Sequence, residues 1–513
     1  MCIAAACSAQ EGARLGPGGA GAASGSSTSP TEDDGEAANP TVAIATGGSG
    51  RAIGGLRYDV NEFGYQEQEY LFSGTAKTFP PSELARQPYR SRMIVWSPSD
   101  PARFNGTTVV EWAQVSDFGQ FELTVELNYQ SPMLEDAGYA FVLVSAEEGG
   151  ICDKTERGCT ATSLKGADPD RYGTLDHPGD PYSFDIFNQA LQALKHPTDV
   201  APLGGLTTRA IIAEGFQASI DKWFPVGATD PSKFSNRPFG IYGALNAYLA
   251  SGADEDARLA DAFLIDGAAP ASEPTRYRVP TLHHLDESAI RRTPTPDSPN
   301  HVTWEVVGAA HTDRWATDHF KYPTTNWPPR LTRAEEEARR EQYEGFEPDA
   351  GGATCRPGRD TGTAYPRRLT LDAALVALNE WVTTGVAAPP AERIQRVDAP
   401  PDEPTNKLVR DVDGNAVGGL RSPIIEVAIG AYDGEGCVEA GVMQPLPPER
   451  LAALYPTHRR YVEQFLAATN TAVERRHLTC GDAETIMREA SSSTAGGTDP
   501  YSATPRCSDP LRP

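Results

Sequence analysis

The side chains that acyl transfer requires occur along this chain in the order serine, carboxylate, histidine. Ser219 comes first, Asp286 and Glu287 follow an apolar run that ends at Leu285, and His311 comes last. In such a site the histidine removes the serine proton, the hydroxyl attacks a carbonyl carbon, and the carboxylate holds the imidazole in the correct tautomer. We therefore expect a hydrolytic site made of Ser219, Glu287 and His311, with Asp286 as an equal candidate for the acid.

The predicted nucleophile does not stand where this chemistry needs it. Residues 210–213 are predicted to form a buried strand, Gly215 a tight turn, and the next residues a helix start. In this frame a Gly-x-Ser-x-Gly sequence lifts a serine above a sheet. Gln217 occupies the apex instead, and its neutral amide has no proton to lose. Ser219 would point roughly 200° away on a helix, so it is either brought to His311 by a rebuilt turn or is an ordinary helix N-terminal serine.

The loop after the predicted strand 107–112 is the expected source of oxyanion donors. Gln114 and Val115 lie in that loop, shortly after Trp112. Backbone N–H groups in such a loop stabilise the charge that develops on a carbonyl oxygen. We therefore predict an oxyanion site near these two residues.

No residue pattern indicates a metal site or a cofactor. His283 and His284 are adjacent, so on a strand they point to opposite faces and cannot share an ion. Residues 411–415 read Asp-Val-Asp-Gly-Asn, but the glutamate that a calcium loop needs further on is missing, and a turn is the better interpretation. The eight cysteines include no Cys-x-x-Cys pair of the kind that binds structural zinc.

The elements that must position these residues alternate between strands and helices. β-branched or apolar runs predict strands at residues 65–76, 92–96, 107–112, 139–145, 210–213, 262–265, 279–285 and 302–307. Apolar stripes predict helices that begin at Asp180, as N-cap, and that span 371–382. A charged stretch within 324–355 is expected to be one exposed helix and a loop. This alternation predicts a mostly parallel sheet covered on both faces.

Charge and hydropathy exclude several classes of partner. The chain has 513 residues, of which 39% are hydrophobic, and 45 Lys+Arg against 70 Asp+Glu give a formal charge of -25. This balance argues against nucleic acid, which needs a basic face, and against docking on anionic lipid. No apolar run approaches the roughly 18 residues of a membrane-spanning helix.

The first 47 residues are expected to be a tether rather than part of the fold. Residues 4–8 read Ala-Ala-Ala-Cys-Ser and resemble the site at which a bacterial lipoprotein is acylated, here on Cys7, and a Gly/Ala/Ser-rich stretch follows. Only six residues precede Cys7, too few for a signal peptide. Either the true start lies upstream, with a lipid anchor at Cys7, or the match is chance and this is an ordinary disordered N-terminus.

Cysteine spacing indicates an oxidising compartment. Cys152 and Cys159 bracket a short polar loop, which suits a local disulfide bond. Four further cysteines, Cys355, Cys437, Cys480 and Cys507, allow three pairings. Proximity in the sequence alone favours Cys355 with Cys437 and Cys480 with Cys507.

Five stretches of the chain carry a family resemblance. They are residues 64–76, 101–112, 168–187, 304–311 and 379–390, and the run Asp-Pro-Asp-Arg-Tyr-Gly-Thr-Leu-Asp-His-Pro-Gly-Asp-Pro-Tyr-Ser within the third is specific. In these stretches the chain resembles the large bacterial alpha/beta hydrolase domain-containing proteins. The resemblance implies an α/β-hydrolase fold and a serine esterase activity on small-molecule esters.

The chain departs from that family at the site itself. The family elbow reads Gly-x-Ser-Gln-Ser, whereas this chain reads Gly-Phe-Gln-Ala-Ser at residues 215–219, as if the serine were deleted or replaced. Residues 221–239 resemble an insertion, and the family acid segment has lost its last aspartate after Glu287. Gln114 stands where the family usually has asparagine.

These observations predict one hydrolase domain and leave two hypotheses for its function. The domain is expected at residues 48–431, with insertions near 221–239 and 324–355, and a C-terminal extension, 432–513, packed on it. The first hypothesis is a bacterial cell-envelope esterase with a degraded or displaced nucleophile. The second is a non-catalytic envelope lipoprotein that binds a ligand or a protein on the same scaffold.

Overall fold

The structure is a computed structural model that describes most of the chain. The described residues are 38–79, 85–115, 121–152, 158–217, 259–267, 277–290, 296–315, 330–344, 346, 363–397, 407–436 and 440–507. Residues 1–37, with Cys2 and Cys7, lie outside them, as do Ser219 and the predicted insertion at 221–239. The predicted end of the tether at residue 47 is wrong, because Thr41–Ile44 form a strand that pairs antiparallel with residues 70–73.

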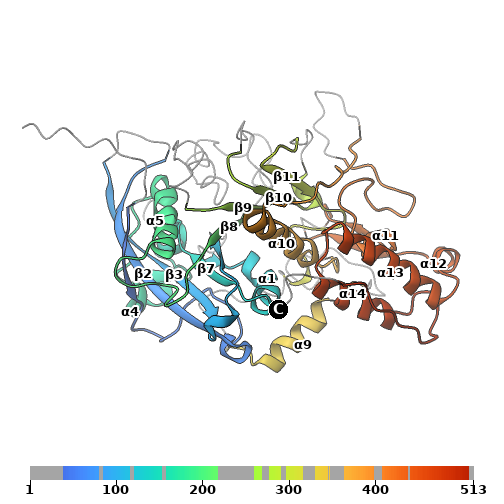
Figure 1. Ribbon diagram of the computed structural model, residues 1–513, viewed down its shortest axis with the longest axis horizontal. Helices are drawn as coiled ribbons and strands as arrows, with labels where there is room; N and C mark the ends of the chain where they lie inside the picture. The colour runs from blue at the N-terminus through green and yellow to red at the C-terminus, as the bar shows by residue number, and fades with distance from the viewer. Residues whose placement is uncertain are drawn as a thin grey trace, which may run out of the picture. The chain divides into compact units, whose positions relative to one another are not determined.

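Nine of the described strands form one sheet in the order β1-β2-β3-β7-β4-β8-β9-β10-β11 (Figure 1). Neighbouring strands from β7 to β11 run parallel, whereas β1, β2 and β3 pair antiparallel, as does β3 with β7. The sheet is therefore mostly parallel, as the sequence predicts. The strands are β1 (Thr41–Ile44), β2 (Tyr65–Ala76), β3 (Gln87–Pro98), β4 (Thr107–Trp112), β7 (Ala140–Val144), β8 (Ala210–Gln217), β9 (Ala262–Gly267), β10 (Thr281–Leu285) and β11 (His301–Glu305).

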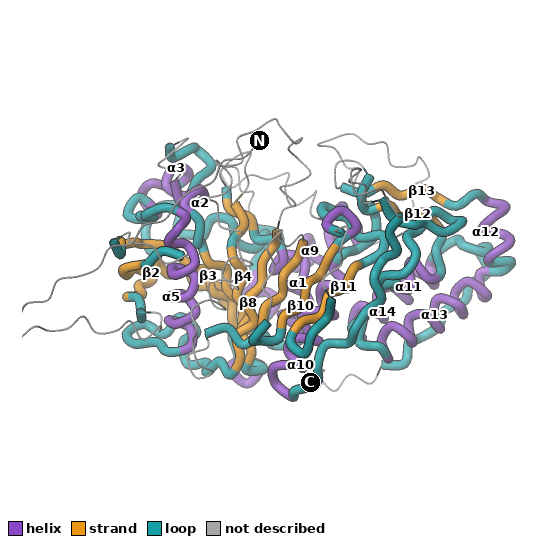
Figure 2. The backbone as a smooth tube through the Cα atoms, turned by 90° about the horizontal axis from the view of Figure 1, so that it is seen from above, coloured by secondary structure: helices purple, strands orange, loops and turns teal. Residues whose placement is uncertain are grey.

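Helices cover both faces of this sheet, because successive side chains of its buried strands point to opposite sides. Val109 and Ile212 lie in a core with α1 (Glu126–Asp136) and α10 (Arg368–Thr384). Val110 and Ala213 lie in a second core with α5 (Ser183–Lys195). Figure 2 shows the strands between α5 on one side and the C-terminal helices α13 and α14 on the other.

The remaining described α-helices and β-strands lie outside the nine-stranded sheet and its main covering helices. They are β5 (Gln114–Val115), β6 (Glu122–Leu123), α2 (Glu148–Cys152), α3 (Leu164–Ala167), α4 (Pro169–Tyr172), α9 (Arg333–Glu344), α11 (Pro423–Glu426), β12 (Gly430–Asp433), β13 (Val442–Pro445), α12 (Pro448–Leu454), α13 (His458–Glu474) and α14 (Cys480–Ser492). Phe465 of α13 and Ile486 of α14 are fully buried in the same core as β4 and β8. The C-terminal segment therefore packs on the sheet domain.

The predicted tight turn at Gly215 is wrong, because β8 continues through it. Gly215 pairs with Ile265 of β9, and the ladder runs on until Gln217 pairs with Gly267. The backbone hydrogen bonds of a neighbouring parallel strand thus keep the glycine extended, although glycine by itself weakens a strand. The residues that follow Gln217 lie outside the described part of the chain.

Two other local predictions need correction. Asp180 is the first residue of a 3-10 turn, Asp180–Tyr182, rather than the N-cap of α5, and its Oδ1 accepts a hydrogen bond from the backbone N–H of Glu148 at 2.9 Å. The predicted exposed helix within 324–355 is α9, but one side of it is buried, with the Arg339 guanidinium 3.8 Å from the centre of the Trp315 ring.

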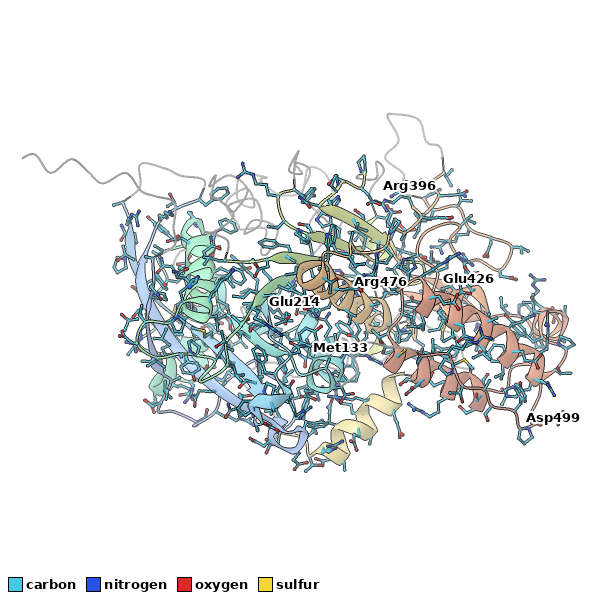
Figure 3. All side chains as sticks on the ribbon, in the orientation of Figure 1. Met133, Glu214, Arg396, Glu426, Arg476 and Asp499 are labelled. Atoms are coloured by element: carbon cyan, nitrogen blue, oxygen red, sulfur yellow. A yellow bond between two sulfur atoms is a disulfide. The ribbon has the colours of Figure 1, made fainter. Side chains whose placement is uncertain are left out.

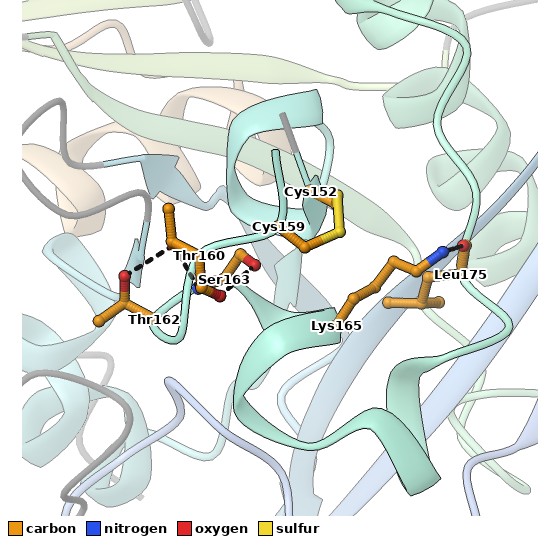
Figure 4. Close-up of a disulfide and its surroundings, with 7 residues drawn as sticks. All are labelled: Cys152, Cys159, Thr160, Thr162, Ser163, Lys165 and Leu175. Atoms are coloured by element: carbon orange, nitrogen blue, oxygen red, sulfur yellow. Dashed lines mark hydrogen bonds between the residues drawn. A yellow bond between two sulfur atoms is a disulfide. The ribbon is translucent and has the colours of Figure 1, made fainter. Parts of the chain in front are cut away.

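One of the expected disulfide bonds is present among the described residues. Cys152 and Cys159 are bonded, at the carboxyl edge of β7 and α2 (Figure 4). Cys480 and Cys507 are not bonded to each other; the Sγ of Cys507 lies 3.9 Å from the carbonyl oxygen of Cys480. The other pair lies outside the described residues.

The chain returns to the outer edge of β11 after α10. Leu420 donates its N–H to the carbonyl oxygen of Glu305 at 2.7 Å and accepts from the N–H of Val307 at 3.1 Å. Nearer the start of β11, the Thr303 N–H donates to Asp297 Oδ1 at 2.9 Å, and its carbonyl oxygen accepts from Arg393 Nη1 at 2.5 Å. This edge strand is therefore hydrogen-bonded on both sides.

Candidate functional site

The predicted acid and base follow adjacent parallel strands. Asp286 comes directly after β10, and His311 follows β11 by a short loop. Parallel strands present their carboxyl ends at one edge of a sheet, where ligands bind in open α/β sheets. The candidate site is therefore at the carboxyl edge of β8, β10 and β11, with β4 and its following loop beside them.

The structure brings Asp286, rather than Glu287, to the histidine. The Oδ2 atom of Asp286 lies 3.8 Å from Nδ1 of His311, and the Asp286 side chain is fully buried. Its other oxygen, Oδ1, accepts from the N–H groups of Ser288 and Ala289 at 2.8 and 3.1 Å. One oxygen thus fixes the side chain as the cap of a 3-10 turn, and the second is left facing the imidazole.

Asp286 is ionised at neutral pH. Burial by itself raises the pKa of Asp286, but the imidazole of His311 beside it and the charge of Arg367 outweigh burial and hold this pKa well below its usual range. The 3.8 Å separation from His311 is longer than a hydrogen bond. Catalytic hydrogen bonds are often long without substrate and shorten in the complex. A charged carboxylate at this position can stabilise an imidazolium.

Glu287 instead holds the histidine loop to the C-terminal segment. Its Oε1 accepts from the N–H of Gly308 at 2.8 Å, and its Oε2 accepts from the N–H of Gly434 at 3.0 Å and from Arg410 Nη2 at 2.9 Å. Burial raises the pKa of Glu287 to about 7, although Arg410 and these N–H groups lower it. All of its oxygen contacts are thus made away from His311.

The loop that presents His311 is fixed by its backbone. Gly308 has a φ of +79°, and a Cβ there would come within 2.8 Å of Ile425 and 2.9 Å of Tyr432. Only glycine adopts this conformation and leaves that space. The carbonyl oxygen of Ala309 accepts from the N–H of Glu287 at 3.0 Å. The histidine therefore emerges from a closely packed turn, with its side chain 12% exposed.

The predicted oxyanion residues form a short hairpin at the same edge. Gln114 pairs with Leu123 and Val115 with Glu122, as strands β5 and β6. The Oε2 of Glu122 accepts from Ser145 Oγ at 2.7 Å, and a buried arginine of β3 also binds it. The Oε1 of Gln114 is a buried atom without a hydrogen-bond partner among the described residues. The side chain of Glu122 thus attaches the hairpin to Ser145 and to β3. No sequence pattern identifies Glu122, because these partners are distant in the chain.

The nucleophile is the part of the site that the described residues do not include. Gln217 is the last residue of β8, and its backbone pairs with Gly267. Ser219 lies outside the described residues. The structure thus places the predicted acid, base and oxyanion segment at one edge, and β8 leads the chain to the same edge.

The strands that end at this edge carry buried acidic side chains on the face of the sheet that packs against α1. Glu111 and Glu214 pair across β4 and β8, and Glu126 begins α1; all three are fully buried (Figure 3 labels Glu214). Glu111 accepts from the N–H groups of Val125 and Leu127 at 2.6 and 3.0 Å, at the start of α1. The carboxyl oxygens of Glu126 and Glu214 have no hydrogen-bond partner in the described part of the chain.

Burial governs the protonation of this acidic group. It raises the pKa of Glu111 to about 7, against the lowering effect of the N–H groups that the carboxylate accepts from. It raises the pKa of Glu214 and of Glu126 well above the ordinary value, and the neighbouring carboxylates, Glu111 and Asp266 among them, add to the effect. Unpaired buried carboxyls avoid the cost of desolvation by keeping a proton. Burial and the neighbouring carboxylates therefore favour the neutral, protonated form of Glu126 and Glu214 in the folded protein.

Neither a metal-binding cluster nor a helix that could span a membrane occurs among the described residues. No cluster of three or more His, Cys, Asp or Glu side chains there is arranged to hold a metal ion. Among the described helices, none combines the length and the hydropathy that crossing a membrane requires.

A family profile described as an alpha/beta hydrolase domain matches residues 37–488. No curated protein matches the chain. Solved structures that match part of the chain include a cold-adapted esterase from an Arctic intertidal metagenomic library, with 11% identity, 43% of this chain and 72% of that chain covered, and a TM-score of 0.20. An α/β serine hydrolase without a lid from Xanthomonas campestris has 9% identity, coverages of 52% and 83%, and a TM-score of 0.23. The rice cell wall degrading esterase LipA from Xanthomonas oryzae has 10% identity, coverages of 46% and 50%, and a TM-score of 0.22. Similarities this low carry no information on substrate or mechanism.

Proposed function

The chain belongs to the alpha/beta hydrolase domain family, and we propose on this basis that it is an esterase-like hydrolase with His311 as base and Asp286 as acid. The observation that carries the proposal is that the two carboxylate oxygens of Asp286 have different contacts. One carboxylate oxygen caps the turn after β10, while the other lies 3.8 Å from the imidazole. In a hydrolase of this kind the acid holds the imidazole tautomer in which one nitrogen accepts a proton.

The reaction we propose is the hydrolysis of a small carboxylic ester. A serine hydroxyl or a water molecule adds to the ester carbonyl and gives its proton to His311, while N–H groups of the hairpin that carries Gln114 and Val115 stabilise the oxyanion. The acyl C–O bond then breaks, and the leaving alcohol takes that proton from His311. Asp286 stabilises the imidazolium that results, since it remains ionised.

We further propose that the nucleophile is degraded or displaced. Gln217 ends β8 where the family resemblance leads us to expect a serine, and its amide cannot attack a carbonyl. A site without its nucleophile keeps only the roughly 10³–10⁴-fold acceleration that oxyanion donors and binding supply. The wild type is therefore expected to hydrolyse short acyl esters weakly or not at all.

The test combines turnover of p-nitrophenyl esters with labelling by a fluorophosphonate probe, which reacts only with an activated serine. Inserting a serine between Phe216 and Gln217 should create or raise activity, and His311→Gln in the same background should remove it. An insertion variant that gains neither activity nor labelling would contradict the degraded-elbow proposal. Brisk wild-type turnover that Ser219→Ala abolishes would instead show that Ser219 is a displaced nucleophile.

The second candidate is a binding protein on the same scaffold, and Gln217 at the end of β8 is the observation that favours it. It predicts no labelling and no turnover in the wild type or in the serine-insertion variant.

We also propose an extracytoplasmic location, with a lipid anchor at Cys7, because disulfide bonds such as Cys152–Cys159 persist in oxidising compartments. Thiol titration of the denatured, unreduced protein tests the compartment: a result in which Cys152 and Cys159 titrate as free thiols would end this proposal.

A further inference from the structure

A buried arginine lies directly behind the candidate site. Arg367 precedes the first turn of α10 and is fully buried. Its Nη1 donates to the carbonyl oxygen of His311 at 2.8 Å, and its backbone N–H donates to Asp313 Oδ2 at 3.3 Å. Asp313 Oδ1 in turn accepts from the hydroxyl of Tyr129, on α1, at 2.8 Å. The main-chain carbonyl of His311 and the side chain of Asp313 are thus both hydrogen-bonded to Arg367.

The same guanidinium reaches the strands that carry the site. Its Nη2 forms an ion pair with Asp266 at the end of β9. Asp266 Oδ1 is 2.9 Å from Nδ1 of His284 on β10, and His284 Nε2 is 2.9 Å from the hydroxyl of Thr370 on α10. Arg367 therefore connects the histidine loop to β9, β10 and α10. The bond to His311 is partly buried, and the contacts with Asp266, His284 and Thr370 are buried.

The charges around Arg367 make it a shared counter-ion. Asp266 and Asp286 are both fully buried. Burial raises the pKa of Asp266, but Arg367 and His284 outweigh burial and lower it, as Arg367 and His311 do for Asp286. The two carboxylates in turn keep the guanidinium charged despite its own burial. Removing one partner of such a group leaves buried charges without compensation.

We propose that Arg367 is the positioning residue of the His311–Asp286 pair: its guanidinium fixes the main chain of His311 and offsets the charges of Asp266 and Asp286. This inference rests on the proposed function, since that function makes the pair the base and acid of the site. Arginine suits the role because its planar, always charged fork reaches a carbonyl and a carboxylate at the same time. An ammonium group at the same position keeps the charge and loses the fork.

The test uses a spectroscopic signature that does not require turnover. The proposed pair requires the 3.8 Å separation between His311 Nδ1 and Asp286 Oδ2 to close to a hydrogen bond in solution. An imidazole N–H that donates to a buried carboxylate gives a strongly deshielded proton resonance, which is assigned in the full-length protein by its loss in His311→Gln and in Asp286→Asn. The Arg367→Met variant should lose this resonance, and Arg367→Lys should restore it as a weaker, exchange-broadened signal. Arg368→Met is the matched control, because Arg368 is the next residue in the chain and its guanidinium pairs with Asp372 of α10 and Asp482 of α14.

The outcomes separate this inference from the proposed function. A wild-type signal that persists in Arg367→Met overturns the positioning role and leaves the His311–Asp286 pair intact. A signal that is absent from the wild type overturns the pair, and the proposed base with it. If Arg367→Met does not fold, the double variant Arg367→Met/Asp266→Asn removes the carboxylate that the lost guanidinium paired with. Its signal is compared with the signal of Asp266→Asn alone. Equal signals in the two variants refute the positioning role, and a signal that is lost from the double variant but kept in Asp266→Asn supports it.

Discussion

Replacing Glu214 with glutamine should make the stability of this protein less sensitive to rising pH. The Glu214 side chain is fully buried and its two carboxyl oxygens have no hydrogen-bond partner among the described residues. Burial, together with the charges of Glu111 and Asp266, raises the pKa of Glu214 well above its ordinary value of 4.5. The folded protein therefore keeps a proton that the unfolded chain releases.

The sign and size of the effect follow from this difference in bound protons. A carboxyl whose folded pKa is raised contributes its full stability below the unfolded value of about 4.5, and that contribution is lost as pH rises towards the folded pKa. In this window each such carboxyl lowers the free energy of unfolding by about 1.4 kcal/mol for each pH unit. Glutamine resembles the protonated acid in shape and does not titrate, so Glu214→Gln should remove about 1.4 kcal/mol of the wild-type loss between pH 5.5 and 6.5. Adding Glu126→Gln should remove about as much again.

The assay is urea unfolding followed by tryptophan fluorescence at pH 5.5, 6.0 and 6.5, for the wild type and the variants. Glu337→Gln is the control, since its side chain lies on α9 with 53% of its surface exposed. A pH slope for Glu214→Gln equal to that of the wild type would refute the reasoning. It would mean that Glu214 is ionised in the folded protein, or that water reaches it.

Two further predictions concern structural interactions near β2 and β7. Glu69→Ala should lower the free energy of unfolding by about 3–5 kcal/mol, because Glu69 pairs with both Arg92 and Arg171, at 2.8 and 2.6 Å, in the buried interior; urea unfolding that stays within 1 kcal/mol of the wild type would contradict this. Cys152→Ser opens a loop with a sequence separation of 7 and should cost about 2–3 kcal/mol. Reduction of the wild type with dithiothreitol should lower its urea midpoint to that of the variant, and a lower midpoint in the variant alone would point to packing of the Cys152 side chain instead.

The sheet was largely predictable from sequence because its strands are apolar runs. β7 and β9 are buried along their whole length, so they read as continuous hydrophobic segments of strand length. The end of β8 was not predictable in this way. Glycine at 215 has the local preference of a turn, but pairing with Ile265 of β9 extends the strand to Gln217, and this partner lies 50 residues further along the chain.

The candidate site was predictable in its outline and not in its acid. Asp286 and Glu287 are consecutive residues after the same strand, so spacing does not distinguish them. Hydrogen bonding does: Asp286 caps the N–H of Ser288, whereas Glu287 binds Arg410, 123 residues further along the chain. The sequence Asp-x-Ser at the cap was a usable signal, since aspartate favours such capping turns. Arg367 carried no comparable signal, because its role depends on the carbonyl of His311, 56 residues away.

The hydrogen bonding at β11 has a consequence for behaviour in concentrated solution. An outermost strand with open N–H and C=O groups is a template on which a second molecule can add its own strand, which is a common route to aggregation. In this protein Asp297, Arg393 and Leu420 already occupy those groups on Thr303, Glu305 and Val307. Versions of the chain that end before residue 393 would lack Arg393 and Leu420 and would expose the carbonyl oxygens of Thr303 and Glu305 and the N–H of Val307. Such fragments should be poorly soluble even where the rest of the sheet folds.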